Sequence, residues 1–130
     1  MNRLLILNLY YAPESFGGAT IVVEQTARRL SDAHDWAVLV VTTMRDHSMP
    51  RYALRRYRIN GVDVIAINVP GESTGEEEYR NSEIARRVIE IARAFQPDVC
   101  HCHAIQVLGC EYFDELRQLG TKIAITAHDC

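Results

Sequence analysis

Short apolar runs alternate along this chain with stretches in which apolar residues recur at helical spacing, and this alternation limits the folds open to it. The apolar runs cover 4–9, 36–42, 62–69, 98–103 and 122–127. Such runs are typical of strands buried on both faces of a parallel sheet. Helical spacing covers 19–30, 82–95 and 105–119. The order predicts an α/β fold: one doubly wound, mainly parallel, Rossmann-like domain over residues 1–130.

Local signals predict where several elements begin and end. Thr20 is the expected N-cap of the first helix, whose buried stripe should be Val22, Val23, Thr26, Ala27 and Leu30. Pro97 and Gly120 should end the second and third helices. Asn60-Gly61 suits a tight hairpin turn, whereas 45–58 shows no clear period and is expected to be a loop.

Composition excludes several classes of protein. Apolar residues make up 48% of the 130 residues, which is enough for a core, and the net charge of −3 gives no reason to expect nucleic acid as a partner. Three of the four cysteines lie within eleven residues, unlike a disulfide framework, and no signal or membrane segment is present. We therefore expect a cytoplasmic protein with reduced thiols.

Five arginines crowd one stretch, at Arg45, Arg51, Arg55, Arg56 and Arg58. A solvated loop accounts for them. A basic lip that meets an anionic acceptor, or the inner face of a membrane, is the functional alternative.

Candidate site residues follow the ends of three strands. Ligands of open α/β sheets bind at the carboxyl edge, where 10–18, 101–103 and 126–129 should meet. Gly17 and Gly18 precede a helix, so free backbone N–H groups and the helix dipole would suit a phosphate there. A plain strand-to-helix turn is the alternative, since the run lacks both the Walker pattern and Gly-x-Gly-x-x-Gly.

Cysteines and histidines alternate along 100–103. Alternation sends Cys100 and Cys102 to one face and His101 and His103 to the other, so the four cannot close one tetrahedral site. We predict no metal, and we expect the cysteines to be small core residues. His101 suits a core position, whereas His103, at the strand tip, is a better candidate for the cleft.

A last histidine, His128, comes just past the final strand. There it can donate to a substrate hydroxyl or phosphate, or it can simply cap the strand.

Three motifs in order resemble one family. Tyr11-Ala12-Pro13-Glu14-Ser15-Phe16-Gly17-Gly18 after a strand, Pro97-Asp98-Val99-Cys100-His101-Cys102-His103, and Ile123-Ala124-Ile125-Thr126-Ala127-His128-Asp129 together resemble glycosyltransferase family 4. The resemblance implies two Rossmann-like domains facing across a cleft, the GT-B fold. The N-terminal domain mostly binds the acceptor and the C-terminal domain mostly binds the nucleotide sugar.

The resemblance also implies roles for single residues. Gly17 and Gly18, with Ala19 beside them, would lie against the donor diphosphate or an acceptor phosphate, and His103 and Asp129 would line the same site. His128 would lie near the transferred sugar as the catalytic residue. The family typically retains anomeric configuration and needs no metal; no cofactor is expected. Thr20 departs from the family, which often has an acidic residue there, and so does Cys130, where an aromatic residue is common.

These expectations make the chain the acceptor-side half of an enzyme, a hexosyltransferase whose nucleotide-sugar-binding C-terminal domain is absent. Its partners would be a nucleotide-diphosphate sugar, a sugar or lipid-linked acceptor, and the missing domain. The end at Cys130, directly after a strand, indicates truncation, so we expect no activity from the chain alone and some self-association through uncovered apolar surface. A stand-alone binding module for a phosphorylated or nucleotide ligand is the alternative.

Overall fold

The computed structural model describes residues 2–13, 17–33, 35–71, 81–104 and 107–126. Its elements, in chain order, are β1 (Asn2–Leu7), α1 (Gly17–Asp32), β2 (Trp36–Met44), β3 (Leu54–Ile59), β4 (Val62–Asn68), α2 (Ser82–Phe95), β5 (Val99–Cys102), α3 (Phe113–Gln118) and β6 (Lys122–Ile125).

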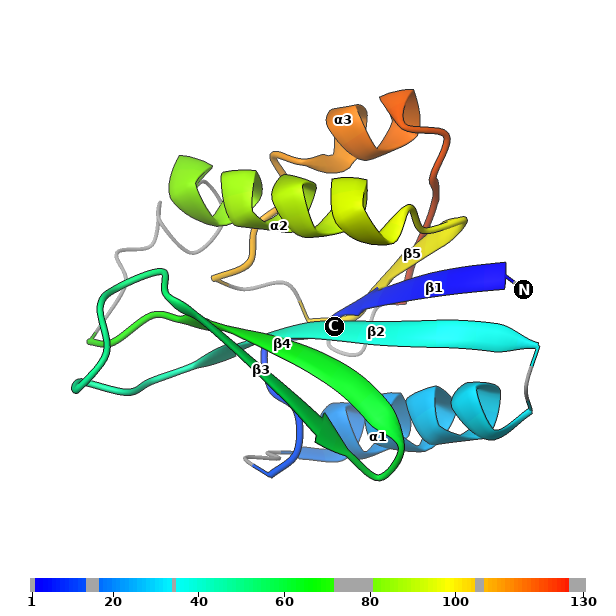
Figure 1. Ribbon diagram of the computed structural model, residues 1–130, viewed down its shortest axis with the longest axis horizontal. Helices are drawn as coiled ribbons and strands as arrows, with labels where there is room; N and C mark the ends of the chain where they lie inside the picture. The colour runs from blue at the N-terminus through cyan, green and yellow to red at the C-terminus, as the bar shows by residue number, and fades with distance from the viewer. Residues whose placement is uncertain (1, 14–16, 34, 72–80, 105–106, 127–130) are drawn as a thin grey trace.

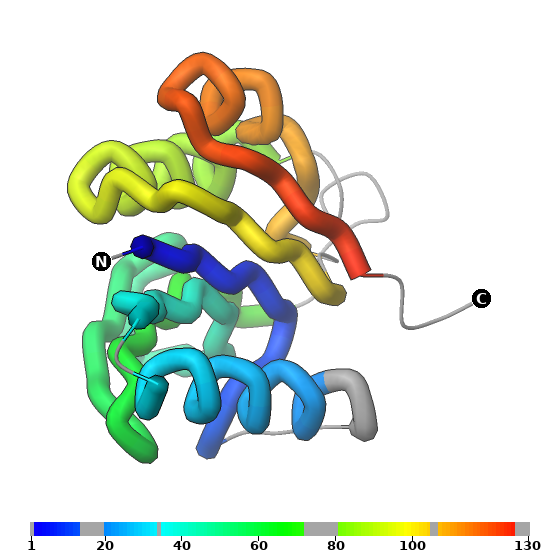
Figure 2. Tube along the Cα trace, turned by 90° about the vertical axis from the view of Figure 1, so that its right-hand side faces the viewer, coloured from blue at the N-terminus to red at the C-terminus, as the bar shows by residue number. Residues whose placement is uncertain are grey.

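The strands form one sheet in the order β3-β4-β2-β1-β5-β6 (Figure 1). Every pairing is parallel except that of β3 with β4, which is antiparallel. Helix α1 lies against one face of the sheet, whereas α2 and α3 lie against the other (Figure 2). The predicted doubly wound, mainly parallel fold is therefore confirmed.

Each face of the sheet has its own core, and β1 contributes to both. Leu5 and Leu7 pack in the cluster that includes α2 and α3, whereas Leu4 and Ile6 pack in the cluster that includes α1. Alternation along a strand explains this division, since successive side chains point to opposite faces. All four side chains are buried, as the apolar run predicts.

Helix α2 has the boundaries that the sequence predicts. Asn81 caps its start, and its side chain accepts hydrogen bonds from the backbone N–H groups of Glu83 and Ile84. Gln96 ends it in the left-handed conformation, with φ of 54°, directly before Pro97. Gly120 follows α3 with φ of 87°, which confirms its predicted role after that helix.

Helix α1 begins earlier than predicted. It starts at Gly17, so Thr20 lies in its first turn rather than at the N-cap, and the Thr20 side chain is buried. The inward stripe is Thr20, Val23, Ala27 and Leu30. Val22 was expected inward but is 50% exposed, because this narrower stripe leaves it on the outer face beside Ile21.

Two other predictions are wrong. The stretch 45–58 is not all loop, since Leu54–Ile59 forms strand β3; exposed arginines on this edge strand interrupt its apolar residues. The predicted helix 105–119 is only Phe113–Gln118, because the positive φ angles of Val107 and Gly109 interrupt it. The Asn60-Gly61 turn is confirmed, with φ of 52° and 78°.

Some apolar surface is left open at the other edge of the sheet. Ile125 on β6 is 59% exposed and Leu119 after α3 is 47% exposed. In the part of the chain that the structure describes, no helix is both long enough and apolar enough to cross a membrane.

Candidate functional site at the carboxyl edge

The strand order places the topological switch point of the sheet between β1 and β5, and we call this place at the carboxyl edge the crevice. These two strands are neighbours, but the chain leaves β1 for α1 on one face and leaves β5 for α3 on the other (Figure 2). The connecting segments therefore diverge at the carboxyl edge of the sheet. Such a switch point is where open α/β sheets bind their ligands.

Asn8, the first residue past β1, joins both sides of this crevice. Its Oδ1 accepts a hydrogen bond from the Ala104 backbone N–H at 3.0 Å, and its Nδ2 donates to the Tyr10 carbonyl at 2.6 Å. Nδ2 also lies 3.5 Å from Thr20 Oγ1 in the first turn of α1. The side chain is buried, so these bonds form away from water. Asn8 thus fixes the segment after β1, the segment after β5 and the start of α1 together.

In the sequence, Asn8 stands out only as a polar residue within the apolar run 4–9. A lone amide at the end of a buried strand was the available signal, since a buried amide must find partners. Its principal partner, Ala104, is 96 residues away, and no local pattern indicates that contact.

The segment after β1 is also held from the β2 side. The Leu9 carbonyl accepts hydrogen bonds from Thr42 Oγ1 at 3.0 Å and Thr43 Oγ1 at 2.8 Å. The Leu9 backbone N–H donates to the Ala104 carbonyl at 2.8 Å. The floor of the crevice is consequently a rigid set of backbone groups.

Gly17 and Gly18 open α1 at this same edge, as the paired glycines predicted. The first N–H groups of a helix have no partner within the helix, and they carry the positive end of its dipole. A helix start of this kind is a general anion-binding feature of proteins. Ala19 lies in the same first turn.

The two histidines of β5 and its tip share one face, as predicted. Their rings stack with centroids 4.0 Å apart, on the side opposite Cys100 and Cys102. His101 Nε2 is hydrogen-bonded to Thr126 Oγ1 at 2.6 Å, which ties β5 to the end of β6. His103 lies at the crevice but is only 7% exposed, so little of its ring faces solvent.

His128 and Asp129 lie outside the described residues. The strand that leads to them, β6, pairs in parallel with β5, and the Thr126 backbone N–H donates to the Cys102 carbonyl at 2.9 Å. The chain thus reaches the carboxyl edge beside His103 at Thr126. The roles of His128 and Asp129 stay predictions.

The cysteines of β5 are core residues. Cys100 and Cys102 are fully buried with their Sγ atoms 3.9 Å apart, and the contact with Cys102, together with burial, raises the pKa of the Cys100 thiol. Among the described residues, no three His, Cys, Asp or Glu side chains converge as metal ligands would.

A cavity of about 230 Å³ adjoins the segment after β1, on the α1 side of the sheet. Tyr11 and Pro13 line it together with Met44, Arg55 and Tyr57. Tyr57 Oη donates to the Ala12 carbonyl at 2.7 Å. Burial, and secondarily the Glu24 carboxylate, raises the pKa of Tyr11 to about 12, so its phenol stays protonated near neutral pH. The sequence analysis named Arg55 only as one of five clustered arginines and missed Tyr57, because it treated this stretch as loop.

The fold and the crevice define a doubly wound α/β domain that offers a helix N-terminus to a ligand at its switch point. Comparison with known proteins defines the family. The model of glycosyltransferase family 4 matches residues 16–130, and the chain belongs to that family. No curated protein matches it.

Two solved structures share the fold. Sucrose-phosphate synthase from Thermosynechococcus elongatus matches with a TM-score of 0.68 at 17% identity, over 99% of this chain and 33% of that one. The catalytic domain of starch synthase IV from Arabidopsis thaliana, bound to ADP and acarbose, matches with a TM-score of 0.68 at 18% identity, over 98% and 34%. The chain thus spans about a third of these structures, and its fold is that of a GT-B N-terminal domain.

Proposed function

We propose that this domain forms the acceptor side of a retaining, metal-independent glycosyltransferase of the hexosyltransferase type. The enzyme would transfer a sugar from a nucleotide-diphosphate sugar to a hydroxyl of a sugar or lipid-linked acceptor. The observation that carries the proposal is the start of α1 at Gly17, which opens on the crevice between β1 and β5 in a chain of this family.

The chemistry of the transfer explains why a helix start suits this place. Breaking the bond between sugar and phosphate builds negative charge on the leaving diphosphate. Backbone N–H groups of Gly17, Gly18 and Ala19, fixed at the start of α1, would stabilise that charge without reorganising. Asn8 has a positioning role here, since it holds the first turn of α1 against the crevice.

The remaining groups of the site would act on the sugar and the acceptor. His128 would donate to a hydroxyl of the transferred sugar, with Asp129 beside it, and His103 would border the acceptor. A C-terminal nucleotide-binding domain would close over this edge and exclude water, so that the acceptor hydroxyl attacks instead. Without that domain the donor has half a site, and we expect the 130-residue chain to be inactive. We place the enzyme in the cytoplasm, with contact to the inner membrane face if its acceptor is lipid-linked.

The test compares this chain with a longer protein that includes the sequence following it in the gene. Release of nucleoside diphosphate from UDP-, ADP- and GDP-sugars would be followed in the presence of EDTA. We expect turnover only from the longer protein, and a loss of at least a hundredfold in His128→Ala. NMR of the product would report the anomeric configuration. Turnover by the 130-residue chain, or none by the longer one with any donor, would contradict the proposal.

A further inference from the structure

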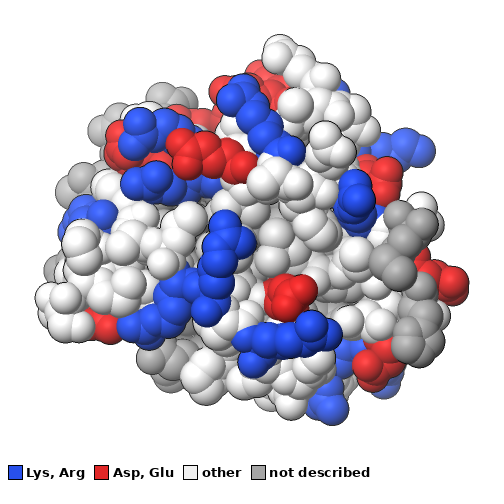
Figure 3. All heavy atoms as spheres, viewed as in Figure 1, with Lys and Arg blue, Asp and Glu red and all other residues white. Residues whose placement is uncertain are grey.

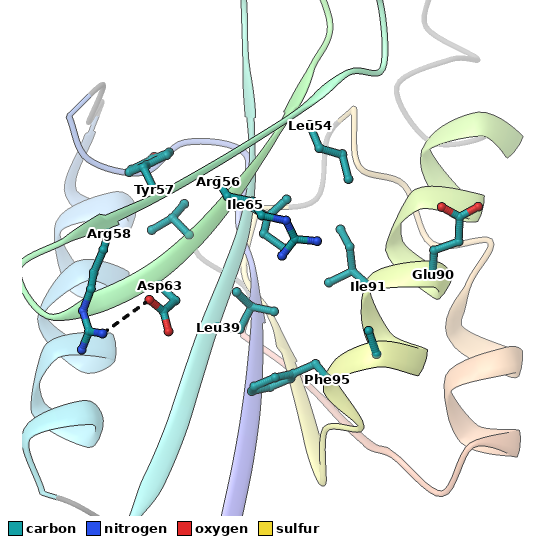
Figure 4. A pocket seen from close by; sticks show the side chains of 12 residues that line it. Leu39, Leu54, Arg56, Tyr57, Arg58, Asp63, Ile65, Glu90, Ile91 and Phe95 are labelled. Atoms are coloured by element: carbon teal, nitrogen blue, oxygen red, sulfur yellow. Dashed lines mark ion pairs between the residues drawn. The ribbon is translucent and has the colours of Figure 1, made fainter.

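A second and larger hollow lies away from the crevice, on the sheet face that α2 and α3 cover only in part. Its volume is about 660 Å³, and it is bounded by β3 and β4 on one side and the C-terminal half of α2 on the other (Figure 4). Sites for small molecules have volumes of roughly 300–1,000 Å³. The hollow is lined from β2, β3 and β4, whereas the candidate site lies between β1 and β5, so the two occupy different parts of the sheet.

The floor of this hollow is apolar and recessed. Leu39 and Ile65 come from the sheet and Ile91 from α2, and they are only 9%, 2% and 4% exposed. A membrane surface would need protruding apolar groups, and a docked helix, about 10 Å across, would need a wide open face. A recessed floor instead suits a single acyl chain or aromatic ring.

The charged side chains that line the hollow differ in whether they form ion pairs. Arg58 pairs with Asp63 at 3.8 Å, and Glu90 pairs with Arg87 at 3.6 Å. Arg56, between them, makes no ion pair or side-chain hydrogen bond with any residue that the structure describes. Figure 4 shows its side chain pointing from β3 into the hollow, and Figure 3 shows basic side chains gathered on this face of the molecule.

We propose that this hollow binds a small anionic amphiphile as a single molecule. The apolar body would lie on the floor formed by Leu39, Ile65 and Ile91, and a carboxylate or phosphate would meet the Arg56 guanidinium. A guanidinium offers two parallel N–H donors to such a group, and bonds of this kind are stronger than those between neutral partners. The site is independent of sugar transfer, because it lies on a different part of the sheet.

The test measures binding of three probes with the same chain length to the 130-residue chain by titration calorimetry. The probes are octanoate, uncharged 1-octanol and octylammonium, all kept below their micelle concentrations. We expect octanoate to bind at one saturable site, at least tenfold more tightly than octylammonium. Equal binding of the anion and the cation would overturn the proposal.

Substitutions of Arg56 separate its charge from its stem. An arginine stem can cover apolar surface without any ligand, and methionine preserves that cover. Arg56→Met should weaken octanoate about tenfold or more and leave 1-octanol unchanged, whereas Arg56→Lys should retain most of the octanoate affinity. Arg86→Gln, which removes an exposed arginine outside the hollow, serves as the control. Unchanged octanoate binding in Arg56→Met would also overturn the proposal.

A second pair of variants tests the opposite wall of the hollow. Ala94 lies there on α2 and is exposed, so a longer side chain does not disturb the core. Ala94→Glu should weaken octanoate several-fold more than Ala94→Gln, because the two fill similar space and differ in charge. Equal effects of the two substitutions would count against an anion in this hollow.

Discussion

Two buried asparagines, Asn8 and Asn68, stand at the carboxyl edge of the sheet and do different work. Asn8 follows β1 and bonds to Tyr10, Thr20 and Ala104, which belong to segments that flank the crevice. Asn68 ends β4, and its side chain bonds to the turn between β2 and β3. Its Nδ2 lies 2.9 to 3.0 Å from the carbonyls of Asp46, Met49 and Pro50, and its Oδ1 accepts from the Asp46 N–H at 2.9 Å.

The comparison shows how one residue type at one edge can serve folding in one place and the site in another. Asn68 replaces the backbone partners that the turn between β2 and β3 lacks, so it stabilises a turn. Asn8 joins positions 96 residues apart and shapes the crevice. Both are buried amides with their partners in place, and both should be costly to remove.

The largest effect should come from Asn68→Ala. It removes the amide that shares its two N–H donors among three carbonyls and accepts from the Asp46 N–H, and it leaves backbone groups of the turn without these partners, so the free energy of unfolding should fall by about 3 kcal/mol. Equilibrium unfolding in urea measures this. Asn2→Ala, at an exposed position on β1, is the control and should change stability by less than about 0.5 kcal/mol. A loss of stability as small as this in Asn68→Ala would mean that the turn is stable without the Asn68 side chain.

Asn8→Ala should cost somewhat less stability, about 2 kcal/mol, because it removes fewer bonds. Its distinguishing effect should be local. Hydrogen exchange at the Ala104 amide should accelerate far more in Asn8→Ala than in Asn68→Ala, since only Asn8 accepts from that group. Equal protection of the Ala104 amide in the two variants would contradict a specific role of Asn8 in holding the segment after β5.

The sequence predicts the strands and helices of this molecule better than the long-range contacts between them. Burial of apolar strands on both faces and helical spacing are local patterns, and they predicted the alternation of elements and the parallel sheet. Strand β3 was missed, because exposed arginines at 55, 56 and 58 lie on both faces of this edge strand and interrupt its apolar residues. The paired glycines correctly indicated a helix start after β1, whereas the site residues at the carboxyl edge stay a prediction. The tie from Asn8 to Ala104 was not predictable, because it depends on which strands become neighbours.

The segments that the two asparagines hold also differ in how they should respond to pH. Tyr11 lies in the segment that Asn8 holds, and burial raises its pKa to about 12 from 10. A raised pKa contributes stability below the unfolded value, and that contribution is lost as pH rises from about 10 towards 12. Tyr11→Phe should therefore flatten the loss of stability between pH 9 and 11.5, measured by urea unfolding. If the variant loses stability as steeply as the parent chain, Tyr11 is not the group that titrates.

The turn held by Asn68 should show the opposite response and the smallest effect. Asp46 is paired with Arg55 at 2.8 Å, and its pKa is lowered to about 2, first by hydrogen bonds from Ser48 and then by Arg55. A lowered carboxyl pKa contributes stability above the unfolded value of 3.8, and this is lost as pH falls through about 2. The Ser48 hydroxyl is the largest single cause, so Ser48→Ala should raise the pKa of Asp46, followed by NMR, although the Ser48 backbone N–H still donates to this carboxylate; Arg55→Gln should also raise it. The pair is exposed and screened by salt, so neither change should measurably alter stability at pH 7. A larger rise in Arg55→Gln would mean that the ion pair, rather than the Ser48 bonds, sets this carboxylate.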